Sequence, residues 1–266
     1  MIKQVPKISQ SLIKNYYDYK AGNSCGLLFA ARYIDHDPDA EMPPTEAMKV
    51  GTYFEYLCTG ALPRNGIKPE PDISYKGKTG EKLSAPYQRA KESAELFKKI
   101  IRNLGIIIQK VGMVLQDDEM NGIIDIYANW GGEDVFIDLK YTGLIDDKWN
   151  DMGWNLETLR ERDKLLIQGV QYKILADRCL KIQNIPFYYF VFSSLNVNNV
   201  RIIKQEVDES RTQSHIVNVH DTISALQKDM YYGFKAYPNF KRCYECPIAT
   251  KCTSKIEVPL IDVIEY

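Results

Sequence analysis

Asp138 and Lys140, two positions apart in Asp138-Leu139-Lys140, are residues whose types and spacing could support catalysis. They end an apolar run that indicates a β-strand, and residues i and i+2 of a strand point to the same face. The acid and the amine are therefore expected on one side of a sheet. The same spacing begins at Asp18 and at Asp146, but neither of these ends an apolar strand. The context thus favours Asp138 and Lys140.

A second carboxylate, Asp125, lies within the preceding apolar stretch, and a hairpin would bring it beside Asp138. Two carboxylates on the buried part of a sheet repel each other and lose hydration unless a cation lies between them. Oxygen ligands suit Mg²⁺ or Mn²⁺, which lower the pKa of a bound water and coordinate phosphate. Lys140 could orient that water, so the pattern predicts phosphodiester hydrolysis. The alternative is a strand-end ion pair without a catalytic role.

Polar residues also interrupt the apolar faces of two expected helices. Glu55 shares a face with small and apolar residues, where it is a candidate third acid; the alternative is a glutamate at a solvent edge. Gln168 and Tyr172, four positions apart, interrupt an apolar stripe and could donate hydrogen bonds to a phosphate or a base. The alternative for this pair is ordinary core packing.

Six cysteines occur in a chain whose start lacks the apolar region of a signal peptide, so we expect ligands or core thiols, not disulfides. Three of them, Cys243, Cys246 and Cys252, stand within ten residues, and Cys25 lies far upstream. Four thiolates can hold a four-iron cluster or a tetrahedral zinc ion, and spacing alone does not choose between them. Either centre would tie Cys25 to the C-terminal tail.

The elements that must position these residues follow from periodicity and turn signals. Helices are expected over 8–20, 45–62, 85–104, 158–180 and 209–234, and strands over 106–116, 122–130, 134–141, 186–193 and 200–207. Their order predicts an α/β or α+β fold with a central mixed sheet flanked by helices. A single domain is expected, because no repeat or flexible linker interrupts the chain. It comprises an N-terminal helical part, a core, and a C-terminal helix with cysteines, over 1–45, 46–208 and 209–266.

The composition is that of an ordinary soluble chain, with 45% hydrophobic and 26% charged residues. No apolar run approaches the length of about 20 residues that a membrane helix needs, so a cytoplasmic protein without membrane contact is expected. The net charge of −1 argues against binding nucleic acid through bulk basicity. Any such contact must be local. Trp149 and Trp154 could stack on single-stranded bases or pack within their own domain.

Four motifs, taken in order, resemble those of RecB-like nucleases in the PD-(D/E)XK superfamily, which share a restriction-endonuclease-like core. They are Gly51-x-x-x-Glu55, Gly122-x-x-Asp125, Asp138-x-Lys140 and Gln168-x-x-x-Tyr172. The first motif of the family more often carries a histidine where this chain has Glu55. The resemblance implies a DNA nuclease with catalytic residues Glu55, Asp125, Asp138, Lys140, Gln168 and Tyr172. The metal ligands would be Glu55, Asp125, Asp138 and the carbonyl of Leu139.

The cysteine arrangement resembles that of the iron–sulfur nucleases, such as the CRISPR-associated RecB-like exonucleases and the AddB nuclease domain, although Gly26 replaces the usual proline after the first cysteine. This implies a [4Fe-4S] cluster on Cys25, Cys243, Cys246 and Cys252, with structural Zn²⁺ as the alternative. It also implies an exonuclease acting on DNA that is single-stranded or has a free end, in recombination, repair, or phage or CRISPR DNA processing. A non-catalytic nucleic-acid-binding or assembly subunit and a restriction-type endonuclease remain alternatives.

Overall fold

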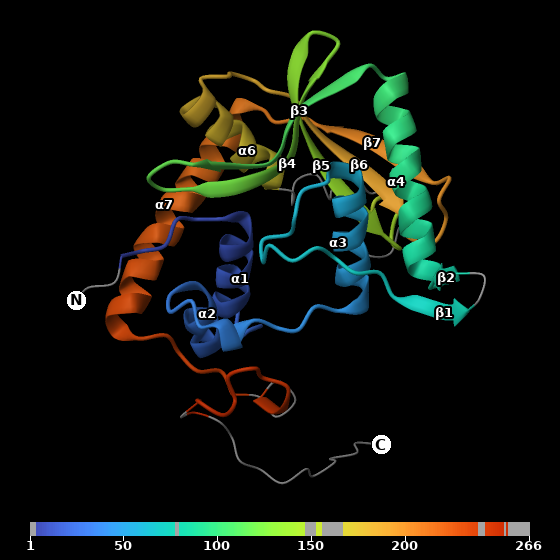
Figure 1. The fold of residues 1–266 in the computed structure, drawn as a ribbon. Coiled ribbons are helices and arrows are strands. Elements are labelled where there is room, and N and C mark those ends of the chain that lie inside the picture. Colours follow the sequence, from blue (N-terminus) through green and yellow to red (C-terminus); the bar gives the residue numbers. More distant parts are fainter. Residues whose placement is uncertain are drawn as a thin grey trace. The chain divides into compact units, whose positions relative to one another are not determined.

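The computed structural model describes residues 4–77, 80–146, 153–155, 167–238, 243–252 and 254. The chain forms two compact units (Figure 1). One comprises Met1–Pro43 with Ile216–Tyr266, and the other comprises Pro44–His215. The expected single domain over 1–266 stays a prediction.

The unit Pro44–His215 is built on a five-stranded sheet in the order β3-β4-β5-β6-β7. The strands are β3 (Ile106–Gln116), β4 (Asn121–Trp130), β5 (Glu133–Thr142), β6 (Phe187–Ser193) and β7 (Val200–Gln205). Only β5 and β6 pair in parallel; the other neighbours are antiparallel. A mixed sheet of this kind with flanking helices confirms the predicted α+β fold class.

The helices of this unit begin and end at residues with clear local signals. Thr45 caps α3 (Glu46–Thr59) by accepting the N–H of Met48 at 3.3 Å, and Gly60 ends the helix at φ +72°. α4 is Ala85–Asn103, and α6 (Gln168–Leu175) continues as one π-helical turn, η2 (Ala176–Leu180). Residues 158–166 of the expected helix 158–180 lie outside the described residues. A small hairpin of β1 (Ile73–Gly77) and β2 (Gly80–Leu83) was not predicted.

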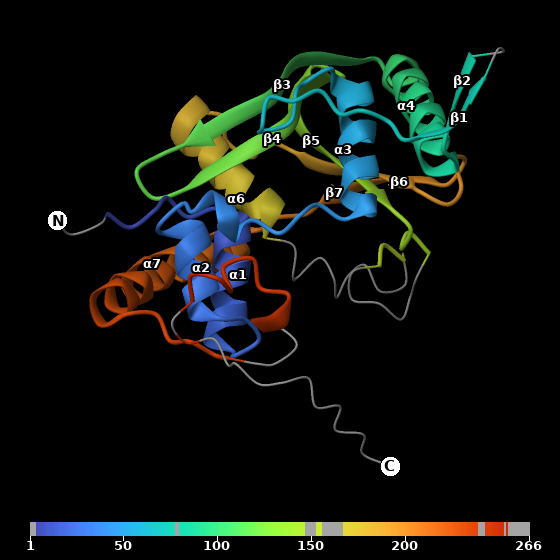
Figure 2. The ribbon, with the colours of Figure 1, turned by 60° about the horizontal axis from the view of Figure 1, so that its bottom comes forward.

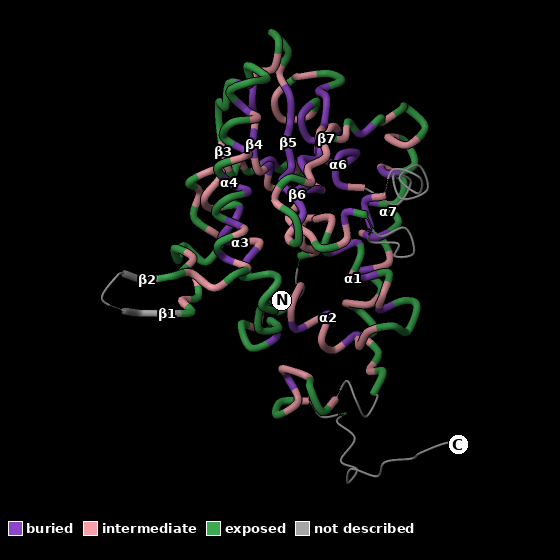
Figure 3. The backbone as a smooth tube through the Cα atoms, turned by 90° about the vertical axis from the view of Figure 1, so that its right-hand side faces the viewer, coloured by how far each residue is buried: buried purple, intermediate pink, exposed green. Residues whose placement is uncertain are grey.

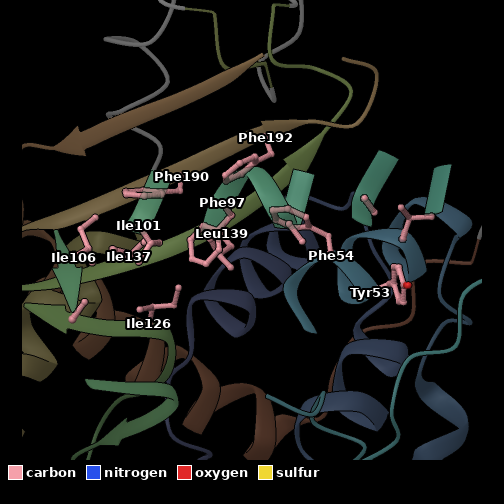
Figure 4. Packing of buried hydrophobic residues seen from close by; sticks show 14 of the residues in the cluster. Tyr53, Phe54, Phe97, Ile101, Ile106, Ile126, Ile137, Leu139, Phe190 and Phe192 are labelled. Carbon is pink, nitrogen blue, oxygen red and sulfur yellow. The ribbon is translucent and has the colours of Figure 1, made fainter. Parts of the chain in front are cut away.

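The two faces of the sheet are covered by different helices, α3 and α4 on one side and α6 on the other (Figure 2). Alternate residues of β4, β5 and β6 form one apolar core with α3 and α4, including Phe54, Phe97, Ile126, Ile137, Leu139, Phe190 and Phe192 (Figure 4). Because side chains alternate along a strand, the residues between them point to the face of α6. Asp138 and Lys140 belong to that second set, and both contact Gln168 of α6.

Burial differs between the inner strands and the edge of the sheet. β6 is buried along most of its length and β5 through its middle, whereas the edge strand β3 is largely exposed (Figure 3). The chemistry-bearing residues of β5 therefore lie on one of the least exposed strands. Within the described ranges, no helix has the length and apolar character needed to cross a membrane.

The other unit contains α1 (Gln10–Lys20), α2 (Gly26–Tyr33), the short helix η1 (Pro38–Ala40) and the part of α7 (Glu209–Tyr232) from residue 216 onward. Tyr16 donates its hydroxyl to Asp229 Oδ2 at 2.7 Å, which joins α1 to α7. The N–H of Gly26 donates to the carbonyl of Lys235 at 3.0 Å. The N- and C-terminal parts of the chain thus fold together in this unit.

Candidate active site

The two predicted aspartates lie where β4 and β5 stop pairing. The antiparallel ladder runs from Trp130 opposite Glu133 to Ile126 opposite Ile137. The next residues are Asp125 and Asp138. On its other side β5 pairs with β6 from Phe136 to Thr142. Asp125 Oδ2 instead accepts the backbone N–H of Leu139 at 2.8 Å, so a carboxylate bridges the strands where the backbone ladder ends.

Lys140 and Gln168 close a triangle around Asp138. The ammonium of Lys140 lies 2.6 Å from Asp138 Oδ2 and donates to Gln168 Oε1 at 3.2 Å. The amide nitrogen of Gln168 in turn donates to Asp138 Oδ1. Asp138 is only 2% exposed, and within the described part of the chain its Oδ2 accepts no hydrogen bond with good geometry apart from the ion pair. Oδ1 of Asp138 thus accepts a hydrogen bond from the Gln168 amide, and Oδ2 faces the Lys140 ammonium.

Tyr172 fixes α6 to β4 beside the aspartates. Its hydroxyl donates to the carbonyl of Ile123 at 2.7 Å and lies 3.4 Å from the amide nitrogen of Gln168. Ile123 lies in the part of β4 that pairs with β3, beyond the end of the pairing with β5. Gln171, the residue before Tyr172, donates to the carbonyl of Asn121 at 2.7 Å. Two side chains of α6 thus bond to backbone carbonyls in the part of β4 that pairs with β3 and not with β5.

Glu55 approaches the same cluster from α3. Its side chain keeps access to solvent, yet it lies among enough protein atoms for burial to raise the pKa of its carboxyl. The charge of Asp138 raises that pKa further, and the ammonium of Lys140 opposes the shift. The structure therefore brings Glu55 within electrostatic range of Asp138 and Lys140. An exposed carboxyl at the edge of a buried cluster fits this behaviour.

The cluster brings three carboxyl groups within electrostatic range of one ammonium, that of Lys140. Burial raises the pKa of Asp125 well above its usual value, and the charges of Asp138 and Glu55 raise it further against the effect of Lys140. Burial lowers the pKa of Lys140, but Asp138 and Asp125 outweigh it, so the net shift is upward. Burial likewise raises the pKa of Tyr172. Three carboxyls share one ammonium, an arrangement that favours an additional cation.

The sequence patterns did not predict that Tyr189 lies beside Lys140. Tyr189 on β6 is fully buried, and its ring centroid lies 5.8 Å from the ammonium. Its position depends on the parallel pairing of β5 with β6, which no local pattern reveals. Trp154 is also buried, with its ring 5.0 Å from that of Tyr189, so it packs inside its own unit and does not offer a face for base stacking. Trp149 lies outside the described residues.

The four predicted cluster cysteines lie in the same unit. Cys25 precedes α2 as its N-cap residue, and Cys246 packs against the small core of Ala31, Ala40 and Ile248. Burial raises the pKa of the Cys246 thiol, the N–H of Ile248 lowers it, and Cys25, Cys252 and Cys243 raise it again. These three cysteines are thus within electrostatic range of Cys246.

Neither cluster has ligands already arranged around a metal. In the described ranges, no group of three or more His, Cys, Asp or Glu has the geometry to hold a metal ion. In the acidic cluster, the ammonium of Lys140 contacts Asp138 directly. The residues of each cluster lie close to one another, and metal ligation by them stays a prediction.

Comparisons with known proteins support the fold. No family profile matches the chain, and no curated protein matches it. The crystal structure of a proposed exonuclease from Eubacterium rectale aligns with a TM-score of 0.61 at 18% identity, covering 97% of this chain and 91% of that one. A second solved structure aligns at a TM-score of only 0.29 with 12% identity, covering 62% of this chain and 68% of that one. The chain therefore has the overall fold of the Eubacterium rectale protein.

Proposed function

We propose that the protein is a metal-dependent nuclease that hydrolyses phosphodiester bonds of DNA, acting as an exonuclease at DNA ends. The observation that carries this proposal is the grouping of Glu55, Asp125 and Asp138 around Lys140 at the point where β4 and β5 separate. Similarity of fold to a proposed exonuclease supports the same class of activity. Nucleic acid is accordingly the proposed substrate.

The residues present fit a hard divalent cation. All the side-chain donors are carboxylate oxygens, which Mg²⁺ and Mn²⁺ prefer. Asp138 Oδ2 is buried and accepts no well-aligned hydrogen bond among the described residues. We propose Glu55, Asp125 and Asp138 as the side-chain ligands, with the carbonyl of Leu139 completing the set. When bound, the ion would lower the pKa of a water molecule and neutralise charge on the phosphate.

The remaining residues have roles that follow from their contacts. Lys140 is the cation nearest to Asp138, so its ammonium is the group proposed to orient the attacking water and to stabilise negative charge that develops on the phosphate. Gln168 contacts both Lys140 and Asp138 and holds them at a fixed separation. Tyr172 anchors the helix that carries Gln168. Positioning of this kind contributes to catalysis without direct bond making.

We also propose a [4Fe-4S] cluster on Cys25, Cys243, Cys246 and Cys252. Cys25, Cys243 and Cys252 each lie within electrostatic range of Cys246, and together the four offer the thiolate donors that such a cluster or a zinc ion needs. The tail that carries three of them is already attached to the N-terminal part by other contacts. Lys251 forms ion pairs with Asp37 at 3.1 Å and with Asp39 at 2.5 Å. The proposed role of the cluster is structural.

The test is a cleavage assay on end-labelled linear duplex, single-stranded and circular DNA, with Mg²⁺, Mn²⁺ or EDTA. We expect metal-dependent loss of linear substrate from its ends and an intact circle. Nicking or linearisation of the circle would instead indicate the restriction-type endonuclease. Binding without cleavage under every metal condition would indicate a non-catalytic nucleic-acid-binding subunit.

Metal binding is tested apart from cleavage by thermal unfolding with and without Mn²⁺. A ligand that binds only the folded state raises the melting temperature. We expect that rise in the wild type and its loss in Asp125→Asn, which removes one proposed ligand and keeps an oxygen able to accept the N–H of Leu139. Equal stabilisation of both proteins would contradict the proposed ligand set.

A further inference from the structure

The ammonium of Lys140 lies over an aromatic ring as well as beside Asp138. Its nitrogen is 5.8 Å from the ring centroid of Tyr189, within the range of a cation–π interaction. Tyr189 stands opposite Asp138 in the parallel register of β5 and β6, and its side chain is fully buried. Lys140 is therefore bounded by a carboxylate, by the Gln168 amide and by an aromatic face.

The ring of Tyr189 is held on several sides. Its hydroxyl donates to Gln205 Oε1 on β7 at 3.2 Å. Phe187 packs against it edge to face with ring centroids 4.9 Å apart, and the Trp154 ring lies 5.0 Å away. A ring with these neighbours has little freedom to turn. It offers Lys140 a fixed surface, whereas the lysine itself has a flexible four-carbon chain.

We propose that Tyr189 is a positioning residue that holds the Lys140 ammonium toward Asp138 and Gln168. The face of an aromatic ring attracts a cation, and more strongly where water is excluded. The Lys140 side chain is 34% exposed, so without the ring its ammonium could turn toward solvent. This inference rests on the proposed nuclease function, because the positioning matters only if Lys140 takes part in the reaction.

The experiment compares Tyr189→Leu and Tyr189→Phe with the control Tyr188→Leu. Tyr188 is the neighbouring residue on β6, points to the other face of the sheet and packs against Trp130 at 4.9 Å. Steady-state cleavage is measured under conditions in which circular dichroism shows that all variants are folded. We expect Tyr189→Leu to lower kcat about tenfold with KM nearly unchanged, as for loss of one cation–π contact. Tyr189→Phe keeps the ring and is expected to retain about half of kcat or more.

A readout without activity accompanies the kinetics. In protein labelled with ¹³C-lysine, the ε-methylene of Lys140, assigned with Lys140→Arg, should show an upfield ring-current shift. That shift should disappear in Tyr189→Leu and persist in Tyr189→Phe and Tyr188→Leu. If the wild type cleaves no DNA, the proposed function fails and the NMR signal still decides the contact. An unshifted Lys140 signal in the wild type, or equal losses of kcat in both leucine variants, would overturn the inference.

Discussion

The ring of Tyr172 occupies the space that a side chain at Gly122 would need. A Cβ at Gly122 would overlap Cε1 of Tyr172 and lie 2.9 Å from its Cδ1. The Tyr172 hydroxyl donates to the carbonyl of Ile123, one residue further along β4. The absence of a side chain at Gly122, three positions before Asp125, thus allows the Tyr172 ring of α6 to pack directly against β4. This explains why a glycine stands in that motif, which the sequence pattern alone does not.

The first prediction concerns this close approach. Gly122→Ala should lower the free energy of unfolding by about 1–3 kcal/mol, because the added methyl forces Tyr172 or β4 to move. Gly51→Ala is the matched control, since Gly51 lies inside α3 and a Cβ there meets no atom within 4 Å. It should stabilise by up to about 1 kcal/mol. Urea unfolding measures both, and an equal response of the two variants would show that Tyr172 does not fill the space.

The second prediction concerns the central acid and amine. Asp138→Asn and Lys140→Ala should each lower cleavage about 1000-fold or more, since they remove a proposed metal ligand and the ammonium beside it. Both variants should remain folded and bind DNA, because the sheet and its core are unchanged. Circular dichroism and a filter-binding assay control for structure and binding. Near wild-type turnover in either variant at saturating metal would rule out this active site.

The third prediction separates positioning from ligation. Gln168→Ala and Tyr172→Phe should lower kcat by about 10- to 100-fold, less than Asp138→Asn, because positioning contributes less than charge stabilisation. Tyr172→Phe leaves the carbonyl of Ile123 without its side-chain donor, which should also cost about 1 kcal/mol of stability. Single-turnover kinetics with saturating enzyme measure the chemical step. Wild-type rates in both variants would assign the pair to packing alone.

The fourth prediction concerns acid stability. Burial lowers the pKa of His215 to about 4 from the ordinary value of 6.5, with Gln171 Oε1 at 3.2 Å from its Nε2. The unfolded chain therefore binds more protons between these two pH values. The contribution of neutral His215 to the free energy of unfolding is therefore complete above about pH 6.5. It falls by about 3 kcal/mol as the pH drops to about 4.

His215→Gln should remove that part of the pH dependence in urea unfolding measured from pH 7 to pH 4. His220→Gln is the control, because His220 is an exposed residue of the same helix. If the wild type and His215→Gln lose stability in parallel as the pH falls, then His215 is protonated in the folded protein without cost.

The fifth prediction concerns the thiols. Serine at Cys25, Cys243, Cys246 or Cys252 should remove iron and sulfide and lower the melting temperature, because metal binding contributes to folding free energy. Cys58→Ser and Cys179→Ser are the controls and should keep the cluster. Protein purified without oxygen is analysed for iron, sulfide, zinc and visible absorption. A colourless protein with one zinc would replace the iron–sulfur proposal, and a metal-free protein with unchanged stability would exclude both.

Much of the sheet could be predicted from local patterns. Alternating apolar residues and turn signals predicted all five strands to within a few residues, and Thr45 marked the start of α3 correctly. The proximity of Asp125 and Asp138 followed from the hairpin that joins their strands. Local information was sufficient here because the two strands are consecutive in sequence.

The contacts between distant segments could not be predicted in the same way. The spacing of Gln168 and Tyr172 indicated polar groups in need of partners, but not that Gln168 would contact both Asp138 and Lys140. Tyr189 carried no signal at all, because its relation to Lys140 depends on parallel pairing across a long connection. The contacts that were not predicted depend on the register between segments far apart in the sequence, and local periodicity carries no information about that register.

The hydrogen bond between Asp125 and the N–H of Leu139 makes that amide a natural spectroscopic reporter. An amide proton bound to a carboxylate resonates downfield and exchanges slowly with solvent while the bond persists. Because Asp125 uses Oδ2 for this bond, any change in the charge or coordination of its carboxyl should shift the Leu139 amide resonance. A ¹⁵N-labelled sample would thus follow the state of the acidic cluster through one backbone signal, without a dye and without a substitution.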